Sequence, residues 1–389
     1  MISLPDALVA TLPSFVELRH ELHAYPELGL QEVRTSERIA GLLTEWGYTV
    51  TRGLAKTGVV GQLQRGAGAK RIGLRADMDA LPIEEATGLP YASRVPGVMH
   101  ACGHDGHTAM LLAAARHLAS HGQFNGTLNV IFQPAEEHPG GARLMIAEGL
   151  FERFPCDAIF AMHNMPGVPQ GHLVFMDGPA LASSDDVSIT IRGQGGHGAL
   201  PHRAADPVVA ASGIVLALQT VVARNVDPLQ SAAITVGAIH GGNANNVIPD
   251  TVSLELSVRA LDSEVRSLLE RRIRSLVQAQ ADSYGVRADI DYRHDYPVLV
   301  NTPAETNLAR QTALALLGTQ RVVTHGPARV GSEDFAFMLE QCPGSYLLIG
   351  NGDGDDACEV HNAGYDFNDA SLGVGASYWC ALVERFLTG

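Results

Sequence analysis

The chain has 389 residues, of which 46% are hydrophobic and 18% charged, so a large buried core can form and disorder of the whole chain is excluded. Its formal net charge is −15, which argues against binding to nucleic acid or to anionic membranes, because both need a basic surface. This length corresponds to two or three domains.

The first part of the chain alternates helical patterns with short apolar strands. Apolar spacing predicts helices over residues 14–24, 36–46, 106–121 and 141–149, and buried strands over residues 71–75, 128–132 and 157–162. Strands that alternate with helices predict an α/β sheet with helices on both faces.

The pattern changes near residue 180. Between residues 186 and 296 it reads strand, helix, strand, strand, helix, strand, which is the order of a ferredoxin-like α+β layout. Helices over 304–317 and 370–387 and a strand over 345–349 then return to α/β character. We therefore predict a mixed-sheet α/β domain formed by residues 1–181 and 297–389, interrupted by an inserted α+β domain over residues 182–296.

The cysteines and the N-terminus favour a cytoplasmic protein. Five cysteines in a long chain do not suggest a disulfide framework. The N-terminal residues lack the basic region of a signal peptide, and the longest uninterrupted apolar run, Ala109–Ala115, is far shorter than the ~20 residues of a membrane span.

Histidines mark the stretches where chemistry is expected. The chain contains 16 histidines, and six of them lie in segments rich in glycine or proline, where metal sites and active sites tend to form. These six are His100, His104, His107, His163, His197 and His361.

Polar side chains also follow the predicted strands. Asp77 and Asp79 come after the first buried strand, Glu136 and Glu137 after the second, and His163 ends the third. Ligands of open α/β sheets bind beyond the carboxyl ends of the strands, so these side chains are candidates for one site.

Cys102 and His104 lie two residues apart in the segment MHACGHDGH. On a loop such a pair can converge on one metal ion, whereas on a helix the two side chains would diverge. The alternative is a buried cysteine followed by a histidine that caps a helix.

Glu136 and Glu137 are adjacent in the segment QPAEEH. On extended backbone their side chains would point in opposite directions, so one could ligate a metal while the other faces the attacking water as a general base. The alternative is a pair of solvated glutamates on a loop.

His163 and His361 would each be structural histidines if taken alone. Together with Cys102, His104 and one glutamate they make five ligands, which exceeds the need of a single tetrahedral zinc ion. Five ligands suit two divalent ions about 3.5–4 Å apart with a shared ligand.

The predicted insertion contributes three candidate donors. His197 lies in GGHGALPH, Asn246 in the loop GNANNVIPD, and Arg259 ends a predicted strand. Such donors fit a substrate carboxylate and the oxyanion formed when an acyl group is attacked. Turn residues and a surface charge remain the alternatives.

Taken together, these stretches resemble the M20 family of metallopeptidases, and within it the amidohydrolase branch of hippurate hydrolases, N-acyl-amino-acid hydrolases and auxin-conjugate hydrolases. The resemblance covers nearly the whole chain in content, order and spacing. The matching segments are RHELHAYPELGLQE (19–32), LRADMDALPIEE (74–85), MHACGHDGHTAMLL (99–112), FQPAEEHPGGA (132–142), AMHNMPG (161–167), GGHGALPH (195–202), GNANNVIPD (242–250), GSEDFAFM (331–338) and HNAGYDFND (361–369).

The resemblance implies a two-metal centre. Its five ligands would be Cys102, His104, Glu137, His163 and His361, with Cys102 as the bridge. The ions would be Zn²⁺ or Mn²⁺, with Co²⁺ and Ni²⁺ also open. Many other M20 branches carry a metal-binding histidine at the position of Asp77, whose duty here falls on Cys102 and His104.

The resemblance also implies the other roles. Glu136 would be the general base that deprotonates the metal-activated water, and Asp79 would orient a ligand. His197, Asn246 and Arg259 would bind the substrate carboxylate and stabilise the tetrahedral intermediate. His100 and His107, which flank the ligand loop, would support it.

The implied reaction is hydrolysis of the amide bond of an N-acyl amino acid, such as hippurate or an N-acetyl amino acid. The implied assembly is a homodimer through the inserted domain, and dimers could pair further into tetramers. His197 would act in its own site or in that of the partner. A dipeptidase, a carboxypeptidase, an N-carbamoyl hydrolase or a deacetylase of an N-acetyl intermediate would use the same centre. A metal-dependent small-molecule binding protein without catalysis is the alternative from another class.

Overall fold

The computed structural model describes residues 5–354 and 357–388. The chain forms two compact units. Unit 1 comprises Met1–Gly178, Val300–Pro327 and Asp334–Gly389, and unit 2 comprises Pro179–Leu299 and Ala328–Glu333.

Unit 1 is built on an eight-stranded mixed sheet in the order β1-β2-β4-β3-β5-β16-β6-β15. Its strands are β1 (Thr49–Leu54), β2 (Gly58–Arg65), β3 (Arg71–Asp77), β4 (Gly126–Gln133), β5 (Ala158–Pro166), β6 (Leu173–Phe175), β15 (Val322–Val323) and β16 (Gly344–Gly352). The central strands β4, β3, β5 and β16 run parallel, whereas the hairpin β1–β2 joins antiparallel to β4. The sequence did not predict this hairpin.

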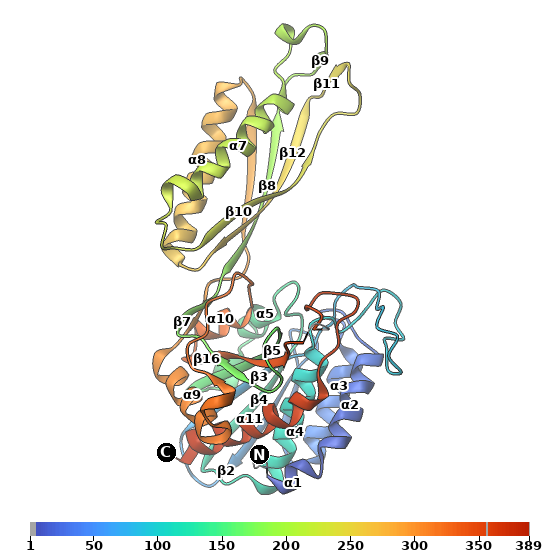
Figure 1. Cartoon of the computed structure of the whole chain (residues 1–389), viewed down its shortest axis with the longest axis vertical. Coiled ribbons are helices and arrows are strands. Elements are labelled where there is room, and N and C mark those ends of the chain that lie inside the picture. The colour runs from blue at the N-terminus through green and yellow to red at the C-terminus, as the bar shows by residue number, and fades with distance from the viewer. Residues whose placement is uncertain (1–4, 355–356, 389) are drawn as a thin grey trace. The chain divides into compact units, whose positions relative to one another are not determined.

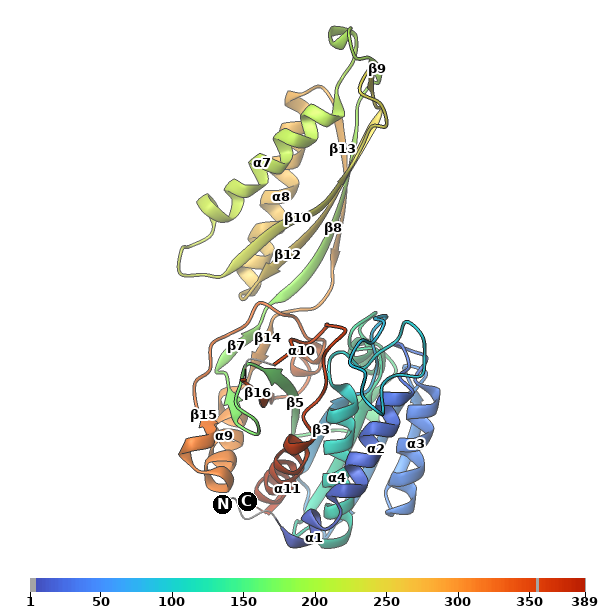
Figure 2. The same cartoon turned by 45° about the vertical axis from the view of Figure 1, so that its right-hand side comes forward.

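Helices cover both faces of this sheet. They are α1 (Asp6–Val9), α2 (Leu12–Ala24), α3 (Val33–Glu45), α4 (His104–His121), α5 (Gly141–Ala147), α6 (Leu150–Arg153), α9 (Pro303–Leu317), α10 (Phe335–Leu339) and α11 (Leu372–Thr388), with 3-10 turns η2 (Thr319–Arg321) and η3 (Asp369–Ser371). The helices α2, α3, α4 and α11 pack together on one face, over a core that includes Leu74, Val130 and Phe160 (Figures 1 and 2). On the other face Phe335 of α10 packs against Tyr346 of β16.

The parallel strands bring their carboxyl ends to one edge of the sheet. Asp77, the last residue of β3, is in register with Gln133, the last residue of β4. His163 lies in the second half of β5. The candidate site residues predicted at the ends of three strands therefore lie at or next to the same edge of the sheet.

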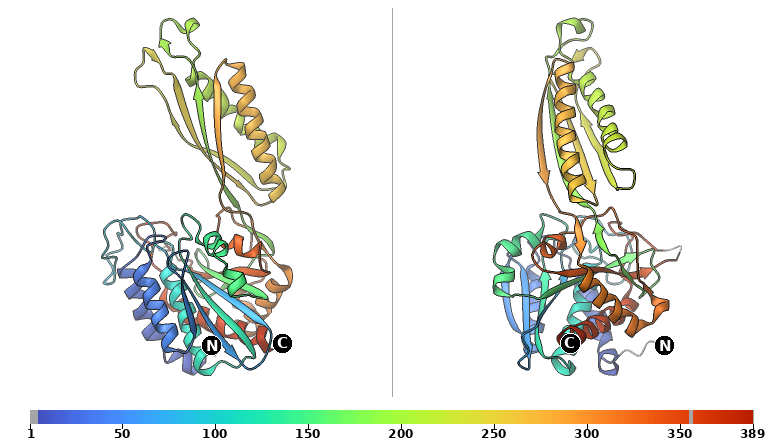
Figure 3. Two further views of the ribbon diagram at one scale, coloured as in Figure 1. Left: turned by 180° about the vertical axis from the view of Figure 1, so that it is seen from behind. Right: turned by 90° about the vertical axis from the view of Figure 1, so that its left-hand side faces the viewer.

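Unit 2 is a four-stranded antiparallel sheet with two helices on one face (Figure 3, right). Its elements are β8 (Ser183–Arg192), β9 (Gly196–His197), η1 (Pro201–Arg203), α7 (Pro207–Asn225), β10 (Ala232–His240), β11 (Val247–Ile248), β12 (Thr251–Ala260), α8 (Ser263–Ser283) and β13 (Arg287–His294). The strand order β10-β12-β8-β13 and the element order both fit the predicted ferredoxin-like layout. Two further strands, β7 (Gly178–Leu181) and β14 (Leu299–Asn301), pair with each other.

The helix α7 carries apolar side chains on both faces. Ile214 and Leu218 are fully buried against the sheet, whereas Leu216 is 72% exposed and Val209 52% exposed. Among the residues that the structure describes, α7 is the one helix that passes a membrane-span test of length and composition, but the core helix of a non-membrane protein passes the same test. Its exposed apolar side chains can equally be covered by another protein surface.

Candidate active site

The five predicted metal ligands come from separate segments of unit 1. Cys102 lies on the loop that enters α4, and His104 is the first residue of that helix. Glu137 lies on the loop after β4, His163 lies within β5, and His361 lies in the segment between β16 and α11.

These five residues form two groups that share Cys102. One potential ligand atom from each of Cys102, His104 and His163 lies within 4.8 Å of the other two, and the same holds for Cys102, Glu137 and His361. In the second group, Nε2 of His361 lies 2.9 Å from Oε1 of Glu137. A thiolate common to two such groups has the position that a bridging ligand requires.

Two of the histidines are oriented as metal-ligating histidines are. Nδ1 of His104 lies 3.2 Å from Oδ1 of Asp79, and its buried Nε2 has no hydrogen-bond partner among the described residues. Nδ1 of His163 lies 2.5 Å from the carbonyl oxygen of Asn164, which leaves Nε2 3.3 Å from Sγ of Cys102. Each ring is held through one nitrogen, so that Nε2 is presented to the cluster.

The cluster carries a negative potential. Burial alone would lower the pKa of His104, but Asp77 and Asp79 outweigh it and raise that pKa to about 10. Burial, and after it the charge of Glu137, raises the pKa of the Cys102 thiol well above its usual value. Divalent cations would compensate this potential and favour the thiolate and the neutral imidazole, so the donor set fits metal ions.

The prediction that Glu136 and Glu137 lie on extended backbone and therefore point in opposite directions is wrong. Ala135 adopts a left-handed conformation with φ +53°, and residues 136–139 form a turn. One carboxylate oxygen from each glutamate lies within 4.8 Å of the other and of a ring nitrogen of His104. Both carboxylates therefore face the same cluster, and Glu136 is only 6% exposed.

Asp79 touches two of the ligand segments at once. Besides its contact with His104, its Oδ2 accepts a hydrogen bond of 3.0 Å from the backbone N–H of Glu137. Its carboxylate is 1% exposed. Asp79 thus links the ring of one candidate ligand to the backbone of another.

Asn164 joins the ligand loops at their backbone. Its Nδ2 donates to the carbonyl oxygen of Cys102 at 2.6 Å, and its backbone N–H donates to Nε2 of His107 at 2.9 Å. Tyr365 donates its hydroxyl proton to Oδ1 of Asn164. A side chain on Gly103 would place its Cβ 2.5 Å from Nδ2 of Asn164, which explains the glycine between Cys102 and the helix.

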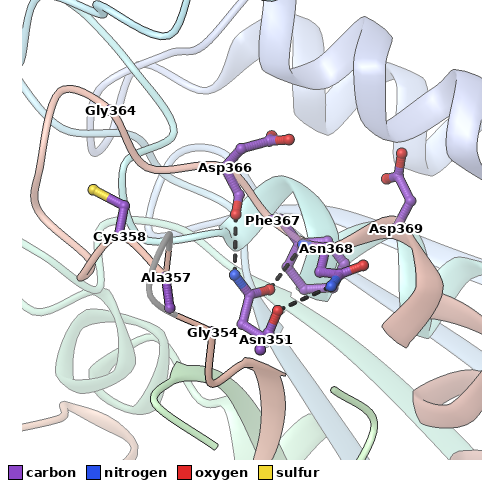
Figure 4. Close-up of a pocket in the computed structure, with 10 residues that line it drawn as sticks. Asn351, Gly354, Ala357, Cys358, Gly364, Asp366, Phe367, Asn368 and Asp369 are labelled. Atoms are coloured by element: carbon purple, nitrogen blue, oxygen red, sulfur yellow. Dashed lines mark hydrogen bonds between the residues drawn. The ribbon is translucent and has the colours of Figure 1, made fainter. Parts of the chain in front are cut away.

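A buried arginine supports the segment that carries His361. Arg19 of α2 is fully buried and donates to Asp366 at 2.7 Å and to Asp369 at 2.8 Å. These aspartates border a pocket in which Asn351 donates to the backbone oxygen of Asp366 (Figure 4). From the sequence, Arg19 was noted only as part of a matching segment, because Asp366 and Asp369 lie 347 and 350 positions away from it.

A second buried arginine holds the end of β3. Arg75 donates to Asp77 at 2.7 Å and to Asp334 at 3.0 Å. Asp334 also accepts from Nε2 of Gln133 at 2.8 Å and from the backbone N–H of Ala142 at 2.9 Å. Asp334 therefore binds Gln133 and Ala142, the two ends of the loop that carries Glu136 and Glu137.

The three predicted donors of the insertion lie in unit 2 at two separate places. His197 in β9 pairs with Val247 in β11, and the N–H of Gly198 donates to the carbonyl oxygen of Asn246 at 2.8 Å. The strand β12 begins at Thr251, shortly after β11, and Arg259 lies at the opposite end of this strand (Figure 1). Eight residues of extended strand span about 26 Å, so the structure brings His197 and Asn246 together but keeps Arg259 of the same chain away from them.

Hydrogen bonds orient both donor groups. Nδ1 of His197 accepts from the N–H of Ala199 at 3.1 Å, so the proton of the neutral ring resides on the exposed Nε2. Nη1 of Arg259 donates to Oγ of Ser332 at 2.8 Å.

Comparison with known proteins identifies the family. The model of the Peptidase family M20/M25/M40 matches residues 73–385. The chain belongs to this family. It is 44% identical to the hippurate hydrolase of Campylobacter jejuni over 96% of both chains, and 41% identical to the N-acetyl-L-cysteine deacetylase of Bacillus subtilis over 94% of this chain and 86% of that one. The crystal structure of Bacillus subtilis YXEP, titled a dinuclear metal binding peptidase from the M20 family, superimposes with a TM-score of 0.85 at 34% identity, covering 97% of this chain and 99% of that chain.

These findings confirm the M20 assignment and the amidohydrolase branch that the sequence motifs indicated. They also confirm the mixed α/β fold with an inserted domain, and they identify the chain as an amide-bond hydrolase that uses divalent metal. The identity of the metal, the substrate and the roles of single residues belong to the proposals below.

Metal binding should release protons from this M20 protein. Cys102 and His104 have raised pKa values and must each lose a proton to become ligands, so adding Zn²⁺ to chelator-treated protein near neutral pH should acidify a weakly buffered solution. A pH indicator measures the release. Cys102→Ala should release fewer protons, whereas His172→Ala, outside the cluster, should match the unaltered protein. Equal release by the unaltered protein and Cys102→Ala would contradict the assignment.

Proposed function

We propose that this protein hydrolyses N-acyl amino acids, of the hippurate or N-acetyl amino acid type, to a carboxylic acid and a free amino acid. The observation that carries the proposal is the largely buried cluster, exposed at His361, in which two ligand groups share Cys102 while the carboxylate of Glu136 lies beside them. The relatives named for hippurate and N-acetylcysteine hydrolysis support the substrate class.

The centre would hold two divalent ions per chain, with Cys102, His104, Glu137, His163 and His361 as ligands. A mixed set of nitrogen, oxygen and sulfur donors suits Zn²⁺ or Mn²⁺, and Co²⁺ or Ni²⁺ also fit such donors. When bound, the ions would lower the pKa of water and polarise the scissile carbonyl group.

Glu136 would act as the general base. Its carboxylate would take a proton from the attacking water and pass it to the nitrogen of the leaving amine. Its burial keeps bulk water from competing for that proton. Asp79 would hold the ring of His104 and the backbone of Glu137, so that the ligands and the base keep a fixed relation to each other.

The donors of unit 2 would recognise the substrate. Arg259 offers a guanidinium group for the substrate carboxylate, and the exposed Nε2 of His197 with Asn246 offers donors for the oxyanion. Because one chain keeps Arg259 far from His197 and Asn246, we propose that His197 and Asn246 complete the active site of the partner subunit.

The assembly would be a homodimer formed through unit 2. The exposed apolar residues of α7, including Leu216, offer a surface that a second copy would cover. The edge strand β10 offers unpaired backbone groups beside it. A cytoplasmic location is supported by the cysteines, which are all free in the structure.

The substrate class can be tested with a panel of amides. Hippurate, N-acetyl amino acids, N-carbamoyl amino acids and dipeptides are incubated with the protein, with and without chelator, and free amine is assayed. We expect chelator-sensitive release that is fastest from the N-acyl amino acids. Faster release from dipeptides would favour a peptidase, as the description of YXEP suggests for that protein, and no release from any amide would favour a binding protein.

The roles of the base and of a ligand can be separated by two variants. Glu136→Ala should keep its metal but lose turnover by about 10²–10⁴-fold, because proton transfer is lost while the ligands stay. His163→Ala should lose metal as well as activity. Atomic absorption measures the metal, amine release measures turnover, and Glu152→Ala on the surface is the control. An active Glu136→Ala enzyme would refute the mechanism.

Mixed dimers test where His197 acts. Chains carrying His197→Ala are co-expressed with chains carrying Glu136→Ala, each inactive by itself. If His197 serves the partner's site, the mixed dimer has one complete site, and up to half of the activity per dimer should return. If no activity returns in purified mixed dimers, His197 acts within its own chain.

A further inference from the structure

Glu32 is a fully buried carboxyl group close to the proposed catalytic loop. It lies at the start of α3, more than 100 positions before that loop in the sequence. Its Oε2 accepts a hydrogen bond of 2.6 Å from the hydroxyl of Thr57, and its Oε1 accepts one of 2.9 Å from the backbone N–H of Ala135. It therefore bridges the hairpin β1–β2 and the residue just before Glu136.

Ala135 needs such a partner because its backbone is strained. A residue with a Cβ rarely adopts the left-handed region, so the surroundings of Ala135 must compensate the strain of this conformation. The N–H of Ala135 is held by Glu32, and its carbonyl oxygen accepts from Gly140 at 3.1 Å and from Gly141 at 2.8 Å. The backbone N–H and the carbonyl group of Ala135 are thus both held by hydrogen bonds.

Close packing leaves the loop no room on this side. A side chain on Gly29 would place its Cβ 2.5 Å from the carbonyl oxygen of His138 and 3.0 Å from Cβ of Ala135. The segment of Gly29–Glu32 therefore lies directly against the loop.

We propose that Glu32 is a positioning residue: its buried carboxyl group holds Ala135 in the left-handed conformation that turns Glu136 and Glu137 toward the same cluster. The proposal rests on the proposed function, in which Glu136 is the base. Displacement of a reacting group by about 1 Å can cost 10²-fold in rate, so an anchor of this kind affects turnover without touching the substrate.

The neutral glutamine is the informative replacement. Burial raises the pKa of Glu32 to about 7, so the group is neutral for part of the time near neutral pH. In Glu32→Gln, Oε1 can still accept from Ala135, while Nε2 can donate to the hydroxyl oxygen of Thr57. In Glu32→Ala both partners lose their acceptor.

Thr57→Val is the matched control. It removes the other hydrogen bond to the same carboxyl group and leaves the one to Ala135 in place. Both Glu32→Ala and Thr57→Val should lower the melting temperature. Thr57→Val therefore shows how much a general loss of stability alone changes the kinetics. All kinetics are measured at a temperature at which every variant is folded.

The kinetic test compares kcat and KM for the best amide of the panel. We expect Glu32→Ala to lower kcat about 10- to 100-fold with KM within threefold, and Glu32→Gln and Thr57→Val to keep kcat within threefold. A kcat of Glu32→Ala within threefold would overturn the proposal. So would an equal loss in Thr57→Val, or a failure of Glu32→Gln to restore kcat.

Hydrogen exchange gives a readout that does not depend on the reaction. Peptides covering residues 134–141 should exchange faster in Glu32→Ala and at the original rate in Glu32→Gln and Thr57→Val. If the unaltered protein cleaves none of the amides, the proposed function fails while this measurement still decides the role of Glu32. Unchanged exchange in Glu32→Ala would overturn the positioning role.

Discussion

The site depends on the cost of burying several carboxylates at one edge of a sheet. An ionised carboxylate without a partner in a protein interior is unfavourable by several kcal/mol, so each must find a cation or hydrogen-bond donors. Arg75 forms ion pairs with Asp77 and Asp334, and Arg19 forms ion pairs with Asp366 and Asp369. The charges of Glu137 and Glu136, which act together with burial to raise the pKa of Cys102, give the cluster a negative potential that divalent ions would neutralise.

The fold supplies the precision that such a centre requires. Parallel strands position Asp77 and His163, and His104 is the first residue of α4, but the other candidate groups lie on loops. Those loops are held through their backbones by buried polar side chains: Asn164 at Cys102, Asp79 at Glu137, and Glu32 at Ala135. Rigid loops of this kind keep ligands and base at fixed distances without contributing ligands themselves.

The sequence predicted the core elements because their signals are local. The buried strands read as continuous apolar runs, and the candidate ligands were predicted from short motifs, some of them at strand ends, and from the family resemblance. The hairpin β1–β2 was missed because residues 49–65 mix threonine, glycine and charged residues and lack a clear apolar alternation. The turn at Glu136 was missed because it depends on Ala135 and on Glu32, which is 103 positions away. The separation of Arg259 from Asn246, in contrast, was already implicit, since the predicted strand lies between them.

Anomalous diffraction from crystals grown with Zn²⁺ or Mn²⁺ tests the central claim most directly, because it locates each ion relative to Cys102. We expect two ions per chain, about 3.5–4 Å apart, with the sulfur of Cys102 between them and Glu136 beside them but not ligating. A single ion, or ions bound away from Cys102, would contradict the central claim.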